Sequence, residues 1–291
     1  MIFKGSAVAL VTPMTQSGEI NYYSLKELID YQIACGTKAI IILGTTGESP
    51  TITIDEREKI IKFCVCMVAK RIPVIVGTGS NSTATAIKLT KQAEKLGADG
   101  ALIVTPYYNK CNQDGLFEHY KKIAGETNLP IILYNVPSRT GVNILPETVL
   151  KLSKIKNIVG LKEASGNLNQ ISEIISLVNG SFAIYSGDDN LTLPILSLGA
   201  VGTISVTANV YPEQMELLCE FALSQDYSNA RRINNFLKNA NHAMFLDVNP
   251  IPVKAYMNLV GFKVGKPRLP LTEASEKLKR ELKEVIKKYE S

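Results

Sequence analysis

The feature that most constrains this chain is a regular alternation of short apolar segments with longer amphipathic ones. Eight short runs rich in β-branched and other apolar residues have strand length, and stretches with apolar residues at helical spacing follow them. Eight βα units in about 225 residues match a closed (β/α)8 TIM barrel of the α/β class. A doubly wound open sheet is the alternative, but such sheets have fewer strands as a rule. The strands are expected at 6–10, 38–43, 73–76, 100–104, 130–134, 158–162, 182–185 and 201–206.

Local signals mark several helix boundaries. Thr53 with Glu56, and Ser24 with Glu27, have the spacing of capping boxes. Pro146 suits the first turn of a helix, and glycine at 97 is expected to end the helix at 82–96. Further helical patterns occupy the end of the chain. We therefore expect a catalytic barrel at 1–225 and a C-terminal helical extension at 226–291.

Composition argues against several classes of function. The net charge is +5, but acidic residues interleave with the basic ones, so a nucleic-acid surface is not expected. No segment approaches the roughly 20 apolar residues of a membrane span. The two histidines and scattered cysteines lack metal-ligand spacing, and no dinucleotide or P-loop signature is complete, so neither a transition-metal site nor a nucleotide site of these kinds is expected. The five cysteines, together with the absence of a signal-peptide pattern, indicate reduced thiols and a cytoplasmic location.

The polar, glycine-rich and aromatic segments follow the ends of the expected strands. In a barrel, these carboxyl ends meet at one face, where active sites are built. The sequence therefore predicts a polar rim that gathers residues from all eight strands. The segments are 12–13, 44–48, 77–80, 105–109, 134–141, 162–163, 186–189 and 205–207.

Lys162 ends an apolar run that has the character of a buried strand. Lysine is rarely buried without a partner or a task. Burial disfavours its charged form, and the resulting free amine can attack a carbonyl to form a Schiff base. The plainer alternative is that Lys162 pairs with Glu163 or another acid at the strand end. Its expected position on the polar rim favours the nucleophile.

Other residues of the rim also have candidate roles in binding or proton transfer. The segment Gly44-Thr45-Thr46-Gly47-Glu48 offers consecutive amides that can hold a carboxylate or phosphate, although an ordinary strand-to-helix turn is the alternative. Tyr134 and Tyr108 could transfer protons near a cationic amine, or merely pack at the rim. Arg139 could bind a substrate carboxylate through its charged fork, or remain a surface arginine.

Nearly the whole chain resembles the dihydrodipicolinate synthase family, within the class I pyruvate aldolase superfamily that also includes N-acetylneuraminate lyase. Several independent motifs carry this resemblance in the same order: GTTGES, GTGSN, TPYYN, YNVPSRTG, GLKEASGN, SGDD, ISVTANV and NPIPVK. The resemblance implies condensation of pyruvate with L-aspartate 4-semialdehyde to 4-hydroxy-tetrahydrodipicolinate, in lysine and diaminopimelate biosynthesis. It implies no cofactor beyond the covalent Schiff base.

The resemblance also implies roles for individual residues. Lys162 would form the imine with pyruvate, and Tyr134 would act as general acid and base. Thr45 and Tyr108 would connect Tyr134 to solvent, with Tyr108 reaching into the site of a neighbouring subunit. A homodimer is therefore implied, and the family commonly pairs dimers into tetramers.

Substrate-binding roles follow from the same resemblance. Thr46 and the adjacent amide would hold the pyruvate carboxylate, and Arg139 would bind the semialdehyde carboxylate. Gly187 and the carbonyl of Ile204 would line the pocket around the pyruvate-bound lysine.

One departure concerns feedback inhibition. Ile54 and Arg57 stand where lysine-inhibited members of the family have histidines, and Thr85 stands where they have a glutamate for the ammonium of the effector. We therefore expect weak or absent inhibition by lysine. Two alternative functions remain: a sialic-acid or 2-keto-3-deoxy sugar acid lyase of the same superfamily, and a non-catalytic keto-acid sensor.

Overall fold

The computed structural model describes residues 1–178, 180 and 182–290, so Asn179, Ser181 and Ser291 lie outside it. Within this part, eight parallel strands form a closed barrel, in which each strand pairs with the next and β8 returns to β1. The predicted TIM barrel is confirmed, and the open-sheet alternative is wrong. The strands are β1 (Gly5–Ala9), β2 (Ala39–Ile42), β3 (Val74–Gly77), β4 (Gly100–Val104), β5 (Ile131–Asn135), β6 (Ile158–Glu163), β7 (Ala183–Ser186) and β8 (Gly202–Ser205).

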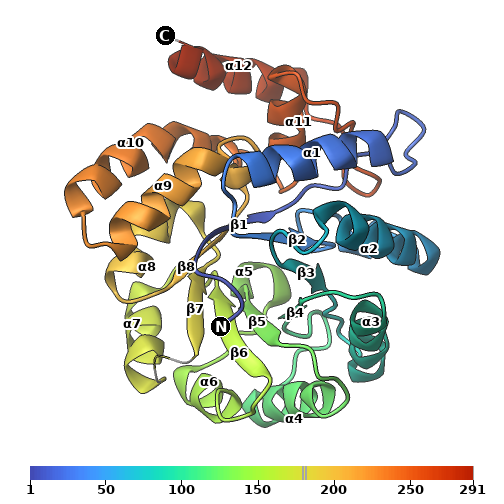
Figure 1. Cartoon of the computed structure of the whole chain (residues 1–291), viewed down its shortest axis with the longest axis vertical. Coiled ribbons are helices and arrows are strands. Elements are labelled where there is room, and N and C mark those ends of the chain that lie inside the picture. The colour runs from blue at the N-terminus through green and yellow to red at the C-terminus, as the bar shows by residue number, and fades with distance from the viewer. Residues whose placement is uncertain (179, 181, 291) are drawn as a thin grey trace.

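Helices surround the barrel, as Figure 1 shows. Each follows its strand along the chain, which is the arrangement that buries both faces of a parallel sheet. The surrounding helices are α1 (Tyr22–Ala34), α2 (Ile54–Val68), α3 (Thr83–Lys95), α4 (Gln113–Ala124), α6 (Pro146–Leu152), α7 (Leu168–Leu177), α8 (Thr192–Ser197) and α9 (Pro212–Leu223). Shorter turns are α5 (Pro137–Thr140), η1 (Ser49–Thr51), η2 (Asp189–Leu191) and η3 (Thr207–Asn209).

Two apolar layers account for the strand sequences. Successive side chains of a strand point to opposite faces, so one set fills the barrel and the other packs against the helices. On β5, Ile132 and Tyr134 belong to the inner cluster, whereas Ile131 and Leu133 belong to the outer one. A polar residue on the inner set near a strand end therefore faces the barrel mouth.

One of the two predicted capping boxes is present in the structure and the other is not. Thr53 caps α2 and forms the predicted capping box with Glu56. The box predicted at Ser24 is wrong, because α1 starts earlier and Asn21 accepts a hydrogen bond from the Ser24 amide. The Asn21 side chain is therefore the N-cap of α1, and Ser24 lies within the first turn of the helix.

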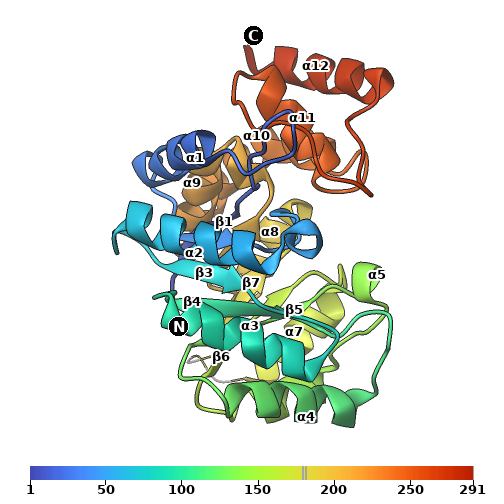
Figure 2. The same cartoon turned by 90° about the vertical axis from the view of Figure 1, so that its right-hand side faces the viewer.

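The last helices lie beyond the barrel ring. They are α10 (Tyr227–Ala243), which packs along α9, and α11 (Ile251–Leu259) and α12 (Glu276–Glu290), which stand at one side of the barrel (Figure 2). The division of the chain at residue 225 stays a prediction. All five cysteines are free thiols. No helix in the described part of the chain has the length and apolar character needed to cross a membrane.

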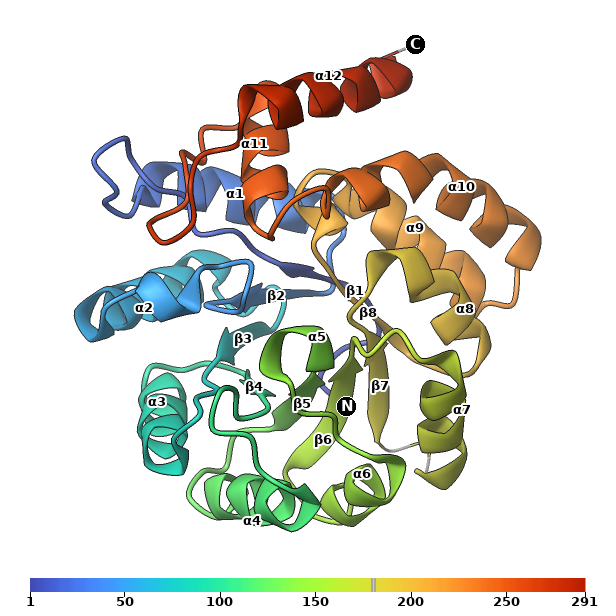
Figure 3. The same ribbon diagram turned by 180° about the vertical axis from the view of Figure 1, so that it is seen from behind.

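The strand ends that carry the polar segments open on the face seen in Figure 3, where α5 lies over the barrel mouth. The N-terminus lies toward the opposite end of the barrel in the side view of Figure 2. The predicted rim is therefore a real surface of the fold, and its residues can be placed one by one.

Candidate functional site

A cavity of about 350 Å³ lies at the barrel mouth. Its walls come from loops after several strands, which is the usual position of an active site in this fold. It brings together six of the eight residues predicted for the site. They are Thr45 and Thr46 after β2, Tyr134 on β5, Arg139 on α5, Lys162 on β6 and Gly187 after β7.

Lys162 faces this cavity and is only 5% exposed. It lies beside Tyr134 in the register of β5 and β6, and its Nζ is 4.5 Å from the centroid of the Tyr134 ring. Among the described residues, no hydrogen bond or ion pair to this Nζ is recorded. Glu163 instead accepts hydrogen bonds from Asn135 Nδ2 at 2.9 Å and from the Ser165 amide at 2.6 Å. The pairing of Lys162 with Glu163 is therefore absent, because consecutive strand residues face opposite sides.

The electrostatic surroundings of Lys162 favour a free amine. The pKa of Lys162 is lowered to about 8, chiefly by burial, while the charge of Asp189 raises it and the charge of Arg139 lowers it. Desolvation disfavours the ammonium because water is no longer available to solvate the charge. A lysine that titrates near neutral pH can supply the uncharged nucleophile that imine formation needs.

Asp189 is a buried acid whose charge raises the pKa of Lys162. Its Oδ2 accepts hydrogen bonds from the amides of Val206 at 3.0 Å and Thr207 at 2.8 Å. Burial raises the pKa of Asp189, and its neighbouring hydrogen bonds counteract that rise. Its charge favours the cationic form of Lys162 and, by the same physics, a cationic imine on that residue.

Tyr134 and Thr45 form the polar side of the same cavity. Burial raises the pKa of the Tyr134 phenol, whereas the charge of Arg139 and a hydrogen bond from the Thr45 side chain lower it. A phenol held between these opposing effects, next to an amine, is suited to proton transfer.

The loop after β2 is a tight turn with several amides that are unpaired among the described residues. The Glu48 amide donates to the Thr45 carbonyl at 3.1 Å, and the Ser49 amide donates to the Gly44 carbonyl at 3.3 Å. In the described part of the chain, the amides of Thr45, Thr46 and Gly47 have no recorded partner. Free amides on a tight turn attract an anion such as a carboxylate. The Thr46 hydroxyl accepts a hydrogen bond from Asn249 Nδ2 at 3.0 Å.

Arg139 lies on α5, at the outer edge of the cavity, and its side chain remains exposed. Its Nη2 donates a long bond of 3.4 Å to the carbonyl of Asn249. Most of its donors are therefore available to a substrate carboxylate. Arg139 and the loop at Thr46 thus share one cavity with Lys162.

Gly187 lies in contact with Lys162. A Cβ atom at Gly187 would stand 2.9 Å from Lys162 Cε and 2.9 Å from Ala164 Cβ, so only glycine leaves room for the lysine stem. Ile204 is fully buried in the inner layer of the barrel and is not among the residues that line the cavity. The structure thus brings Gly187 into the site but leaves the predicted contribution of Ile204 open.

Tyr108 is the other predicted residue that stays apart. It is 92% exposed and has a positive φ of 70°. It does not line the cavity within this chain, whereas its neighbour Tyr107 lines an adjoining cavity of about 490 Å³. Tyr108 therefore completes no relay within one subunit.

Sequence reasoning missed several residues of the cavity wall. Phe245 and Asn249 come from the segment between α10 and α11, and Asn190 follows the SGDD segment. The motif containing Asn249 was visible, but nothing in it indicated a contact with Thr46. Among the described residues, no group of three or more His, Cys, Asp or Glu side chains could hold a metal ion.

Comparison with known proteins is consistent with this geometry. The model of the dihydrodipicolinate synthetase family matches residues 2–289. A 4-hydroxy-tetrahydrodipicolinate synthase from Thermoanaerobacter sp. (strain X514) is 52% identical over 289 residues, covering 99% of this chain and 97% of that protein. The crystal structure of dihydrodipicolinate synthase from Aquifex aeolicus has a TM-score of 0.97 and 49% identity, covering 99% of this chain and 98% of the other.

A structure described as a monomeric dihydrodipicolinate synthase variant is also similar. It has a TM-score of 0.96 and 47% identity, and the match covers 98% of this chain and 96% of the other. With a family model spanning nearly the whole sequence and relatives about half identical to it, the chain belongs to the dihydrodipicolinate synthetase family.

Proposed function

We propose that this chain is a lyase that condenses pyruvate with L-aspartate 4-semialdehyde through a Schiff base on Lys162. The product is 4-hydroxy-tetrahydrodipicolinate, an intermediate of lysine and diaminopimelate biosynthesis. One observation carries the proposal: a buried lysine with a pKa of about 8 shares a cavity with Arg139 and the anion-binding loop of Thr46. The names of the relatives agree with this reaction.

The chemistry follows from the nucleophile. The free amine of Lys162 attacks the ketone carbon of pyruvate, and loss of water leaves a protonated imine. This imine draws electrons from the methyl group, which loses a proton to give an enamine. The enamine carbon attacks the aldehyde carbon of the second substrate. The amino group of that substrate then attacks the imine carbon, closes the ring and releases Lys162. These reaction steps need neither a metal ion nor an organic cofactor.

Protons must move in each of these steps. Tyr134 lies beside Lys162 and would exchange these protons, and Thr45 lines the same cavity and lowers the pKa of the Tyr134 phenol. Tyr108 would continue the relay to solvent from a second subunit, since its exposed side chain is outside the cavity of its own chain. This role requires a homodimer, and we expect a tetramer of two such dimers acting in the cytoplasm.

Specificity is electrostatic in this proposal. The pyruvate carboxylate lies on the amides and hydroxyl at Thr46, and the carboxylate of the semialdehyde lies on Arg139. The carbonyl of Ile204 and the space left by Gly187 would accommodate the imine. Two anionic substrates thus meet a cation and an amide nest, which orient them around one nucleophile.

Borohydride trapping tests the central step. Incubation with pyruvate and reduction should place a pyruvyl adduct on Lys162, detected by peptide mass mapping. An adduct on another lysine, or none at all, would refute the mechanism. Turnover of aspartate semialdehyde should greatly exceed cleavage of neuraminate, which separates this function from the sugar acid lyases, and any turnover excludes a sensor.

Arg139→Ala tests how the second substrate is recognised. We expect kcat/KM for the semialdehyde to fall by about 10- to 100-fold, because a charge-assisted pair is lost. Formation of the pyruvate adduct should persist. Equal loss of both would show that Arg139 serves the imine step.

The absence of strong lysine inhibition is a further expectation. Arg57 is buried and donates to Ser49 Oγ at 2.8 Å and to the Gly77 carbonyl at 2.6 Å, in the wall of the cavity that also includes Ile54 and Thr85. Within the described residues, Glu48 is the acidic residue of that wall, and it is already paired with Lys254. An added ammonium would find no free carboxylate. Half-inhibition of condensation at low millimolar lysine or below would contradict this.

A further inference from the structure

Residues far apart in the sequence meet beneath the anion-binding loop after β2. Glu48 ends this loop, and Lys254 lies on α11, yet their charged groups are 2.7 Å apart and each side chain is 1% exposed. We propose that Glu48 and Lys254 are positioning residues that hold the Thr45–Gly47 amides in their carboxylate-binding arrangement. The C-terminal extension is then a working part of the pyruvate site. This inference depends on the proposed function, because it assigns the loop a pyruvate carboxylate.

The backbone at Glu48 directs its side chain inward. Glu48 has a positive φ of 58°, a left-handed conformation that is unfavourable for a residue with a Cβ atom. Its side chain is secured at both oxygens. Oε1 accepts from Lys254, and Oε2 accepts from the amide of Arg268 at 2.8 Å. Both partners come from the C-terminal extension, so the extension holds the left-handed turn that closes the loop.

Lys254 satisfies all three of its ammonium donors in this region. They bond to Glu48 Oε1 at 2.7 Å, to the Thr12 carbonyl at 3.1 Å and to the Lys266 carbonyl at 3.2 Å. Thr12 in turn donates from its hydroxyl to the Gly47 carbonyl at 2.7 Å. The Gly47–Glu48 segment is therefore held from two directions, once by the carboxylate and once by the carbonyl.

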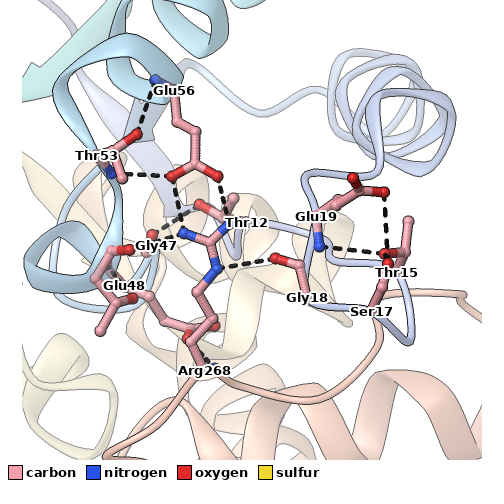
Figure 4. A network of polar contacts seen from close by, with 11 residues as sticks. Thr12, Thr15, Ser17, Gly18, Glu19, Gly47, Glu48, Thr53, Glu56 and Arg268 are labelled. Atoms are coloured by element: carbon pink, nitrogen blue, oxygen red, sulfur yellow. Dashed lines mark hydrogen bonds and ion pairs between the residues drawn. The ribbon is translucent and has the colours of Figure 1, made fainter.

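Arg268 extends the same assembly outward, as Figure 4 shows. Its guanidinium contacts Glu56 through two bonds and donates to the Gly18 carbonyl at 2.9 Å. Glu56 belongs to the capping box of α2 and does not touch the loop amides. Glu56 therefore provides a matched control, since it contacts the Arg268 guanidinium and not Glu48, Lys254 or the loop amides.

Loss of one charge would rearrange the loop. A buried carboxylate without its ammonium must be protonated or reach water, and reaching water means turning Glu48 outward. Because the Glu48 amide and carboxylate both shape the turn, the amides of the loop would lose their common direction. Displacements of about 1 Å in a binding group can cost roughly 100-fold in rate or affinity.

Steady-state kinetics of the full-length protein test this inference. For Lys254→Met we expect the pyruvate KM to rise by about 10- to 100-fold, while kcat at saturating pyruvate changes by less than about 3-fold. The pyruvate concentration that gives half-maximal borohydride adduct on Lys162 should rise in parallel. Glu48→Gln should behave similarly. The double variant Glu48→Gln/Lys254→Met removes both charges and should recover most of the affinity.

Glu56→Gln is the matched control. It should lower the melting temperature and leave the pyruvate KM within about 2-fold of the parent. If Lys254→Met does not fold, Glu48→Gln and the double variant carry the same comparison. An unchanged pyruvate KM in a folded single variant, with only a lower melting temperature, would overturn the inference and leave the pair purely structural.

Measurements on the parent protein distinguish the proposed function from the positioning role of Glu48 and Lys254. Failure of the parent to trap pyruvate on Lys162 would refute the proposed function itself. Normal trapping in the parent, with the same half-saturating pyruvate in Glu48→Gln and Lys254→Met, would refute only the positioning role.

Discussion

Two buried lysines of this protein differ in the partners around their amino groups. Lys162 ends β6 at the barrel mouth, lies against the Tyr134 ring and has no recorded ionic partner in the described part of the chain. Lys254 lies on α11, 1% exposed, and its ammonium contacts Glu48 and two carbonyls. Burial lowers the pKa of both, and a carboxylate counteracts the shift in each case. Glu48 does so for Lys254 through a direct ion pair, whereas Asp189 acts on Lys162 through its charge alone.

The difference shows what turns a buried lysine into a nucleophile. An ammonium with three bonds is held charged and unreactive, whereas a desolvated amine without a partner releases its proton near neutral pH. Burial alone therefore does not identify a catalytic lysine. The arrangement of partners around the nitrogen does.

The two lysines should differ most in whether their variants still form the pyruvate adduct. Lys162→Ala should abolish the pyruvate adduct and condensation, because no other lysine is found among the described residues that line the cavity. Lys254→Met should still form the adduct at high pyruvate. Mass mapping after borohydride reduction compares them directly. Adduct on Lys162→Ala would break the comparison.

Stability should change in opposite directions. Lys254→Met leaves Glu48 buried without a partner and should destabilise the fold by about 3–5 kcal/mol. Lys162→Met removes an unpaired buried charge and should stabilise it at pH 7 by up to roughly 3 kcal/mol. Denaturant unfolding at pH 7 measures both. Destabilisation by Lys162→Met would indicate that Lys162 has an unrecognised stabilising partner.

The sign of the Lys162 contribution can be checked against pH. Its pKa is about 8 when folded and higher when unfolded, so its charge penalises the fold below pH 8. The penalty should disappear as the pH rises toward the unfolded value. The stability advantage of Lys162→Met should therefore shrink over the same range.

The rate of adduct formation should follow the same titration. We expect it to rise with pH and to reach half its maximum near pH 8. Asp189→Asn removes the charge that favours the ammonium, so the midpoint should move to lower pH. Rapid quenching with borohydride across a pH series gives this profile. A midpoint that stays in place would show that Asp189 does not influence Lys162.

The smallest effect concerns the outer ion pair beside Lys254. Contact with Arg268 lowers the pKa of Glu56 to about 2, so the pair stabilises the fold above the ordinary carboxyl range and is lost as the pH falls toward 2. Because this pair is partly exposed, Glu56→Gln should cost only about 1 kcal/mol at pH 7. Unfolding at pH 7 and pH 3 should show the difference shrinking in acid. A much larger cost would make the outer pair equivalent to the buried one.

Much of the site was predictable because strand order alone determines the rim. Lys162, Tyr134, Thr45, Thr46, Arg139 and Gly187 follow the ends of expected strands, and the closed barrel brings them to one cavity. Tyr108 and Ile204 could not be placed in the same way. The first is exposed on its own chain, and the second is proposed to contribute only a backbone carbonyl, which residue type does not reveal.

Apolar periodicity and strand ends are local properties of the chain, so the barrel, the rim and the candidate nucleophile were predictable from the amino-acid sequence. The folded chain was needed to show that Lys162 does not pair with Glu163 and that Lys254 pairs with Glu48. The reason is distance along the chain: Lys254 lies 206 positions after Glu48, and no local sequence pattern encodes a contact between residues so far apart.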